Sequence, residues 1–107
     1  MYMRDLFIIE CLNTKLFQSI VNELRRCDYV CYSNFDESEY YEVTPALIAE
    51  VLSYRNFIMI DHDLVFYYQG EIVLNYSCLS REIEISYDFF HDFINDGRRF
   101  LLDYYAF

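Results

Sequence analysis

The sequence predicts an α+β domain in which two or three helices pack on one face of an antiparallel sheet of about four to five strands. Apolar residues recur at helical spacing in separate segments, and short runs rich in β-branched and aromatic residues fill the middle of the chain. The chain has 107 residues, of which 55% are hydrophobic, so it has the size and the apolar content of one folded domain. We therefore expect residues 1–107 to form a single domain.

Helices are predicted in three segments. In the first, residues 14–26, the apolar residues Leu16, Phe17, Ile20, Val21 and Leu24 fall on one helical face. The second spans residues 45–54, because Thr44 is a good N-cap residue and proline is well tolerated in the first helical turn. A third helix is expected to begin at Ser86, with Asp88 in its first turn.

Strands are predicted where apolar and aromatic runs are bounded by turn residues. The expected strands are residues 29–33, 40–43, 57–60, 64–68, 71–76 and 82–85, while the apolar run 6–12 fits either a strand or a helix start. Asp61 to Asp63 and Gln69-Gly70 supply turns, so the middle of the chain should form an antiparallel meander. Adjacent strand residues face opposite ways, so Tyr67 and Tyr68 should lie on opposite faces of the sheet.

Several functional classes lack their sequence signals. The two glycines, Gly70 and Gly97, stand apart, whereas phosphate loops, dinucleotide-binding turns and serine elbows need clustered glycines. No apolar run reaches the roughly 18 residues of a membrane span, and the N-terminus lacks the pattern of a signal peptide. We therefore expect a cytoplasmic protein with no membrane contact, and we expect its four cysteines to be free thiols.

Catalytic and metal-binding patterns are weak. His62 lies between Asp61 and Asp63, and His91 precedes Asp92, but aspartates are also the residues that turns and first helical turns prefer. Cys27 and Cys31 are spaced wrongly for a redox motif or the usual zinc knuckle. A cysteine–histidine nucleophile pair stays open, since such pairs meet in space rather than in sequence. We expect no enzyme activity, no metal and no cofactor.

The negative charge is concentrated in two blocks. The chain has a net charge of −10, and residues 36–54 and 82–97 contain acids without any lysine or arginine. The acids of these blocks are Asp36, Glu37, Glu39, Glu42 and Glu50 in the first, and Glu82, Glu84, Asp88, Asp92 and Asp96 in the second. Solubility alone is one explanation of such charge, and a charged binding face is the other.

The spacing of the acids favours a binding face. Glu82 and Glu84 share one face of a predicted strand, and Asp88, Asp92 and Asp96 form a row on a predicted helix at intervals of about 6 Å. Tyrosine is common at binding surfaces, and Tyr40-Tyr41 adjoins the first block. The candidate partner-binding residues are therefore Asp36, Glu37, Glu39, Glu42, Glu82, Glu84, Asp88, Asp92, Asp96, Tyr40 and Tyr41.

In composition, the chain resembles phage-encoded acidic inhibitors that imitate nucleic acid, including anti-restriction and anti-CRISPR proteins. Those proteins are small, acidic and rich in aromatic residues. The resemblance covers no specific motif, so it assigns no residue roles. It implies an inhibitor in the host cytoplasm that does not bind nucleic acid directly. Such a protein occupies the basic surface of a nucleic-acid-binding protein or nuclease complex.

Two other functions remain open on the sequence. One is an immunity protein or antitoxin that caps a toxic nuclease, because acid-rich proteins bind basic nuclease sites rapidly. The other is a structural or assembly module that forms a homo-oligomer such as a homodimer, with the aromatic residues at the interface between copies. Whether the two acidic blocks form one surface decides how large a charged face the protein can present.

Overall fold

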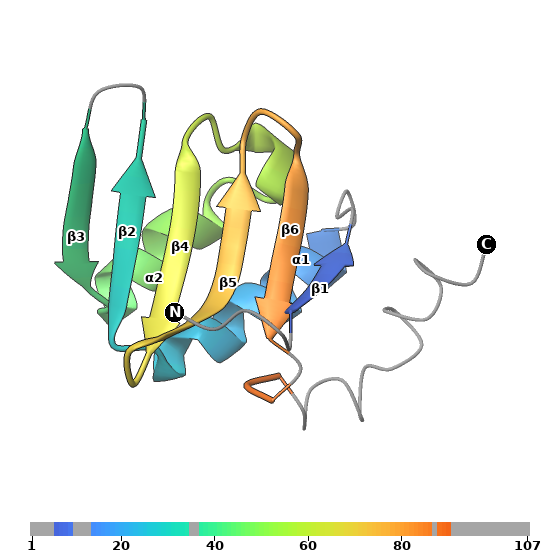
Figure 1. The fold of residues 1–107 in the computed structure, drawn as a ribbon. Coiled ribbons are helices and arrows are strands. Elements are labelled where there is room, and N and C mark those ends of the chain that lie inside the picture. Colours follow the sequence, from blue (N-terminus) through green and yellow to red (C-terminus); the bar gives the residue numbers. More distant parts are fainter. Residues whose placement is uncertain (1–5, 10–13, 35–36, 87, 91–107) are drawn as a thin grey trace.

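The chain folds into a six-stranded antiparallel sheet. The computed structural model describes residues 6–9, 14–34, 37–86 and 88–90, and its strand order is β1-β6-β5-β4-β2-β3 (Figure 1). The strands are β1 (Leu6–Ile9), β2 (Tyr29–Ser33), β3 (Ser38–Glu42), β4 (Asp63–Tyr68), β5 (Glu71–Ser77) and β6 (Glu82–Ser86). Every paired neighbour is antiparallel. The predicted α+β class is confirmed, and the sheet includes both the 6–9 run and the short β3 strand.

Two helices lie on one face of this sheet. Helix α1 (Thr14–Glu23) continues into the 3-10 turn η1 (Leu24–Arg26), and α2 (Pro45–Leu52) follows β3. Figure 1 shows both helices behind the sheet, where α1 connects β1 to β2 and α2 connects β3 to β4. None of the described helices is both long enough and apolar enough to span a membrane.

The core fills the space between the helices and the sheet. Val30, Phe66, Leu74 and Ile85 occupy paired positions on neighbouring strands, so they form one buried row across the sheet. Helix α1 contributes Phe17, Ile20 and Val21 to the same core, η1 contributes Leu24, and α2 contributes Ile48 and Val51. Burying each large apolar side chain stabilises the fold by about 1.5–3 kcal/mol, so these residues fix the helices against the sheet.

Helix α2 begins as the sequence predicts. Thr44 has an extended backbone, and its Oγ1 accepts a hydrogen bond from the backbone N–H of Leu47 at 3.1 Å. Pro45 occupies the first turn, where its missing N–H costs no helical hydrogen bond. The helix therefore has a defined start, which fixes the position of its exposed face.

The predicted strand at residues 57–60 is wrong. Phe57–Met59 forms a 3-10 turn, η2, between α2 and β4. Both edges of β4 are already paired, with β2 on one side and β5 on the other, so no sheet position is open beside it. The apolar residue at position 57 serves the core instead of a strand: Phe57 is buried, and its ring centroid lies 4.8 Å from that of Phe17.

The predicted meander is present with one strand changed: residues 64–68 and 71–76 pair as β4 and β5, but β6, rather than residues 57–60, is the third strand. Its first turn has positive φ at both Gln69 and Gly70, which is the conformation of a type I′ hairpin turn. Tyr67 and Tyr68 lie on opposite faces, as predicted, since Tyr68 packs against the core and Tyr67 pairs with Tyr29 on the other face.

Ser86 also acts as predicted, because its Oγ accepts a hydrogen bond from the backbone N–H of Phe89 at 3.3 Å. Residues 88–90 form a turn, and the rest of the predicted third helix lies outside the described residues.

Candidate functional site

The first acidic block lies at one edge of the sheet. Glu39 and Glu42 belong to β3, in which all five residues are exposed, and Glu37 lies in the turn before it. Tyr40 and Tyr41 alternate between the two faces of this strand, with exposed fractions of 65% and 43%. Asp36 is outside the described residues. The block thus presents carboxylates and phenol rings together along an exposed strand.

The second acidic block lies near the other edge. Glu82 and Glu84 point to the same face of β6, as the spacing predicts, and Glu84 accepts a hydrogen bond from Asn75 Nδ2 at 3.3 Å. Asp88 is exposed in the turn that follows β6. Asp92 and Asp96 lie outside the described residues, so the predicted helical row is described only at its first member.

The described parts of the two blocks are well separated. Strands β2, β4 and β5 lie between β3 and β6, which places the two strands roughly 19 Å apart at the usual strand spacing. Figure 1 shows β3 at one end of the sheet and β6 near the other. The described acids therefore form two regions rather than one continuous patch.

Acids of the first block border a cavity of about 510 Å³ that lies between the β2–β3 hairpin and helix α2. We call it the acidic–aromatic cavity. Its lining combines four rings, three carboxylates and a few smaller groups: Tyr32, Tyr41, Tyr54, His62, Glu39, Glu50, Asp61, Ser33, Asn34 and Leu47. Sheet and helix geometry explain this combination. Tyr32 pairs with Glu39 across the strands, while Leu47, Glu50 and Tyr54 recur three and four residues apart.

The four rings form a series around the cavity, in which each ring lies beside the next: Tyr41, Tyr32, His62 and Tyr54. The ring centroids of Tyr41 and Tyr32 are 5.5 Å apart, and those of Tyr32 and His62 are 5.0 Å apart. Tyr54 extends the series, with its centroid 6.4 Å from that of His62. The interplanar angles range from 55° to 71°, so the rings present both edges and faces to the cavity.

The carboxylates give the cavity a negative potential. Burial and, to a smaller extent, the nearby charge of Glu50 together raise the pKa of Tyr32 to about 12. The hydrogen bond from the Tyr41 hydroxyl to Glu39 raises the pKa of Tyr41 as well. Both phenols therefore keep their protons near neutral pH, and the carboxylates supply the charge.

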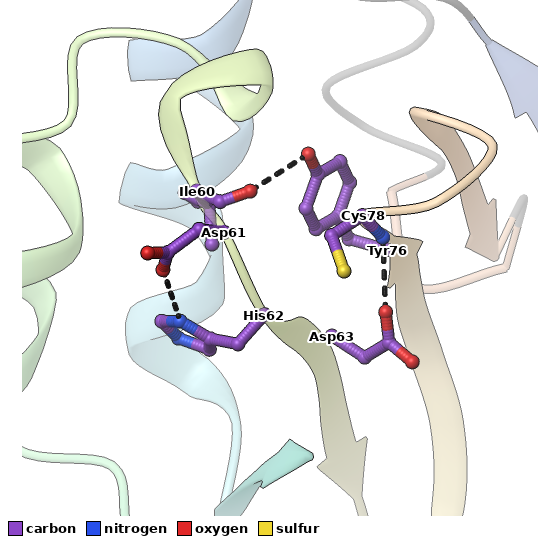
Figure 2. Close-up of polar contacts among 6 residues, drawn as sticks. All are labelled: Ile60, Asp61, His62, Asp63, Tyr76 and Cys78. Carbon is purple, nitrogen blue, oxygen red and sulfur yellow. Dashed lines mark hydrogen bonds and ion pairs between the residues drawn. The ribbon is translucent and has the colours of Figure 1, made fainter. Parts of the chain in front are cut away.

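The Asp61-His62-Asp63 segment is not arranged as a metal site. Figure 2 shows Asp61 turned toward His62, whose Nδ1 lies 3.2 Å from Asp61 Oδ1, while Asp63 turns away. Asp63 Oδ1 accepts a hydrogen bond from the backbone N–H of Cys78 at 2.9 Å. Among the described residues, no group of three or more histidines, cysteines or acids is placed to hold a metal ion. His91 lies outside the described residues.

A second hollow, of about 330 Å³, differs from the acidic–aromatic cavity because an arginine is part of its lining. It is lined by Tyr68, Glu71, Asp88, Phe89 and Arg26, among others. The Arg26 guanidinium lies 4.2 Å from the centre of the Phe89 ring, and Arg26 also pairs with Glu23 at 3.2 Å. This hollow already contains a cation, so it lacks the uncompensated negative charge of the acidic–aromatic cavity.

The described cysteines, Cys27, Cys31 and Cys78, are free thiols, as predicted. Burial raises the pKa of Cys27 to about 12, and burial also raises the pKa of Cys78. The Cys27 and Cys78 thiols are therefore held in the protonated form near neutral pH, which does not favour nucleophilic chemistry.

Comparison of the chain with protein-family models, with curated proteins and with solved structures gave no match. The site therefore has to be interpreted from its own geometry.

Sequence analysis missed Tyr32, Tyr54 and His62 as neighbours in one site. The shared face of Glu39 and Tyr41 and the helical spacing of Leu47, Glu50 and Tyr54 were the signals available. Joining them required knowing that β3 and α2 border the same cavity.

Proposed function

We propose that this protein binds the basic surface of a nucleic-acid-binding protein or nuclease and inhibits it by occupying that surface. One observation carries the proposal: three exposed carboxylates, Glu39, Glu50 and Asp61, line one cavity, and a fourth, Glu37, lies in the adjoining β2–β3 turn. We call this cluster the acidic end. In the described part of the chain, no arginine or lysine forms an ion pair with any of the four.

The edge strand β3 supports a protein as the partner. All five of its residues are exposed, and its outer edge pairs with no other strand of the described sheet. An exposed edge can accept a strand from a partner through main-chain hydrogen bonds. Exposed Tyr40 and Tyr41 add contact area at a low cost in conformational entropy.

The composition supports a more specific version of this function. The chain resembles phage-encoded inhibitors of the anti-restriction and anti-CRISPR type, which act on basic nucleic-acid-binding surfaces in the host cytoplasm. In this version the carboxylates take the place of phosphates. The separation of β3 from β6 favours a compact acidic end as the contact over a long row of charges.

The experiment is an affinity capture from bacterial lysate with the tagged protein at roughly 50 mM and 500 mM salt. We expect basic nucleic-acid-binding proteins to be retained at low salt and lost at high salt, because screening weakens contacts between exposed charges. A variant with Glu37→Gln, Glu39→Gln and Glu50→Gln should retain much less of them. Equal capture by both proteins at both salt concentrations would contradict the proposal.

Sedimentation of the purified protein tests the homodimer alternative. A concentration-dependent dimer that persists at high salt and is broken by Tyr40→Ser would favour an assembly module instead.

A further inference from the structure

The acidic–aromatic cavity joins a wall of rings to a rim of carboxylates. Tyr32 and Tyr54 are half-buried and flank His62, which is 20% exposed, whereas the Asp61 side chain is 93% exposed at the rim. Aromatic faces attract cations through their negative π-systems, and carboxylates attract them through charge. Both parts of the cavity thus favour the same kind of ligand.

The carboxylates of the cavity are only partly satisfied. Asp61 interacts with His62, and Glu39 accepts a hydrogen bond from the Tyr41 hydroxyl. The Glu50 carboxylate makes no hydrogen bond or ion pair with another described side chain. None of the described residues that line the cavity is a lysine or arginine that would neutralise them. The cavity therefore has room and charge for an added cation.

His62 contributes a ring to the wall, and its two nitrogens differ in their partners. A carboxylate only accepts hydrogen bonds, so the contact with Asp61 places the proton of the neutral imidazole on Nδ1. This leaves Nε2 as an acceptor, and Nε2 is buried without a partner in the described structure. Nε2 is shielded from solvent, so the His62 ring, rather than this nitrogen, is the part of the residue that counts as cavity wall.

The size and chemistry of the cavity narrow the ligand further. A volume of about 510 Å³ lies within the range of small-ligand sites. An anion would meet three carboxylates, and an apolar group would bury them without compensation. A guanidinium group fits best, because it is planar, stacks on rings and donates hydrogen bonds to carboxylates in a fork.

We infer that the acidic–aromatic cavity receives the guanidinium group of an arginine side chain on the basic partner. The inference rests on the proposed function for the source of the arginine. In the complex, the guanidinium stacks against Tyr54 or Tyr32 and donates hydrogen bonds to Glu50 and Glu39.

A titration with small probes tests the cavity without the partner. The probes are N-acetyl-L-arginine methylamide and its citrulline counterpart, which has a similar shape but no charge. We expect the arginine probe to shift the NMR signals of the Tyr32, Tyr54 and His62 rings with a dissociation constant on the order of millimolar, as one isolated side chain allows. The citrulline probe should bind at least about tenfold more weakly. Equal shifts with both probes, or none with either, would overturn the inference.

Matched variants locate the binding. Glu50 lies on the exposed face of α2, and Glu50→Gln should weaken binding of the arginine probe about five- to tenfold. The matched control, Glu82→Gln on β6, should leave binding of the probe unchanged. Tyr54→Leu should weaken it similarly, and Tyr29→Leu, on the opposite face of the sheet, is its control. Equal effects of Glu50→Gln and Glu82→Gln would show a general charge effect and contradict a site in the cavity.

Binding to the captured partner separates this inference from the proposed function. If Glu37→Gln with Glu39→Gln slows association but Glu50→Gln and Tyr54→Leu do not weaken the complex, the guanidinium site is wrong and the acidic end still binds. If none of these variants changes binding, the proposed function fails as well.

Discussion

Gly70 has a backbone conformation that its neighbours in the β4–β5 turn require. Its φ is +80°, in the region where residues with a Cβ are strained. A Cβ built at this position meets no atom within 4 Å, so space is not the constraint. The turn is also held by Asp28, whose Oδ2 accepts a hydrogen bond from the backbone N–H of Gln69 at 2.6 Å.

Replacing Gly70 with alanine should therefore show the energetic cost of the left-handed backbone alone, without any steric clash of the added Cβ. We predict that Gly70→Ala lowers the free energy of unfolding by about 1 kcal/mol, measured by urea denaturation, because a left-handed conformation costs an L-residue about that much. Gln69→Gly, which removes a Cβ from the preceding left-handed residue, is the matched control and should not destabilise the protein. A loss well under 0.5 kcal/mol for Gly70→Ala, on the scale of that cost, would contradict the turn geometry.

Cys27 is a buried thiol between η1 and β2, with 6% of its surface exposed. Burial raises its pKa from 9.0 to about 12, the nearby Arg26 lowers it, and Asp28 raises it. Its folded pKa lies above the unfolded value, so the folded state retains its proton when the unfolded chain has lost it. This contribution to stability is complete below pH 9 and is lost as the pH rises toward 12.

The prediction concerns the difference between the wild-type protein and Cys27→Ala. Over this alkaline range, the wild type should lose stability faster than the variant by up to about 1.4 kcal/mol per pH unit, since one proton is involved. Denaturant unfolding at several pH values between 7 and 11 would measure it. Parallel curves for the two proteins would mean that the thiol is not protected by burial.

At the scale of single elements, helix α2 is the element that shapes the candidate site. Its buried face carries Ile48 and Val51 into the core, while half-buried Leu47 and exposed Glu50 line the cavity. The start of the helix depends on the Thr44 cap. A weaker cap would therefore affect both the stability of the fold and the position of Glu50.

We predict that Thr44→Ala destabilises the protein by about 1 kcal/mol, the usual cost of losing an N-cap hydrogen bond. Thr44→Ser retains the accepting oxygen and should stay close to the wild type. Thermal and urea unfolding of the three proteins would test this. If the serine variant is as unstable as the alanine variant, the hydroxyl is not the source of the stability.

Local sequence patterns predicted most helices and strands. The features that they did not predict, the turn at residues 57–59 and the cavity, depend on contacts between distant parts of the chain. The cap of α2, the apolar face of α1 and the alternation of the meander depend on nearby residues, so they are visible in the sequence. Residues 57–60 are apolar enough for a strand, but the edges of β4 are taken by β2 and β5. The cavity depends in the same way on a fold that brings β2, β3 and α2 around one space, which no local pattern encodes.

At the scale of the molecule, the strand order determines how the charge is presented. The two acidic blocks look equivalent in the sequence, but β3 lies at an edge of the sheet and β6 lies four positions away. Among the described acids of the two blocks, those that line the acidic–aromatic cavity belong to the first block. We therefore propose the acidic end, rather than the described acids near β6, as the partner-binding surface.

The central claim is that association with the basic partner depends on the acidic end. The most direct measurement is the association rate of the captured partner, over a series of salt concentrations, with two charge-matched variants. One variant carries Glu37→Gln, Glu39→Gln and Glu50→Gln, and the other carries Glu71→Gln, Glu82→Gln and Asp88→Asn. Both lose three negative charges, so net charge alone affects them equally.

The account predicts that the first variant associates about tenfold or more slowly at low salt and loses most of its salt dependence, because local charge steers the encounter. The second variant should associate within about threefold of the wild-type rate, since long-range charge is largely screened. Equal rates for the two variants would contradict the assignment of binding to the acidic end.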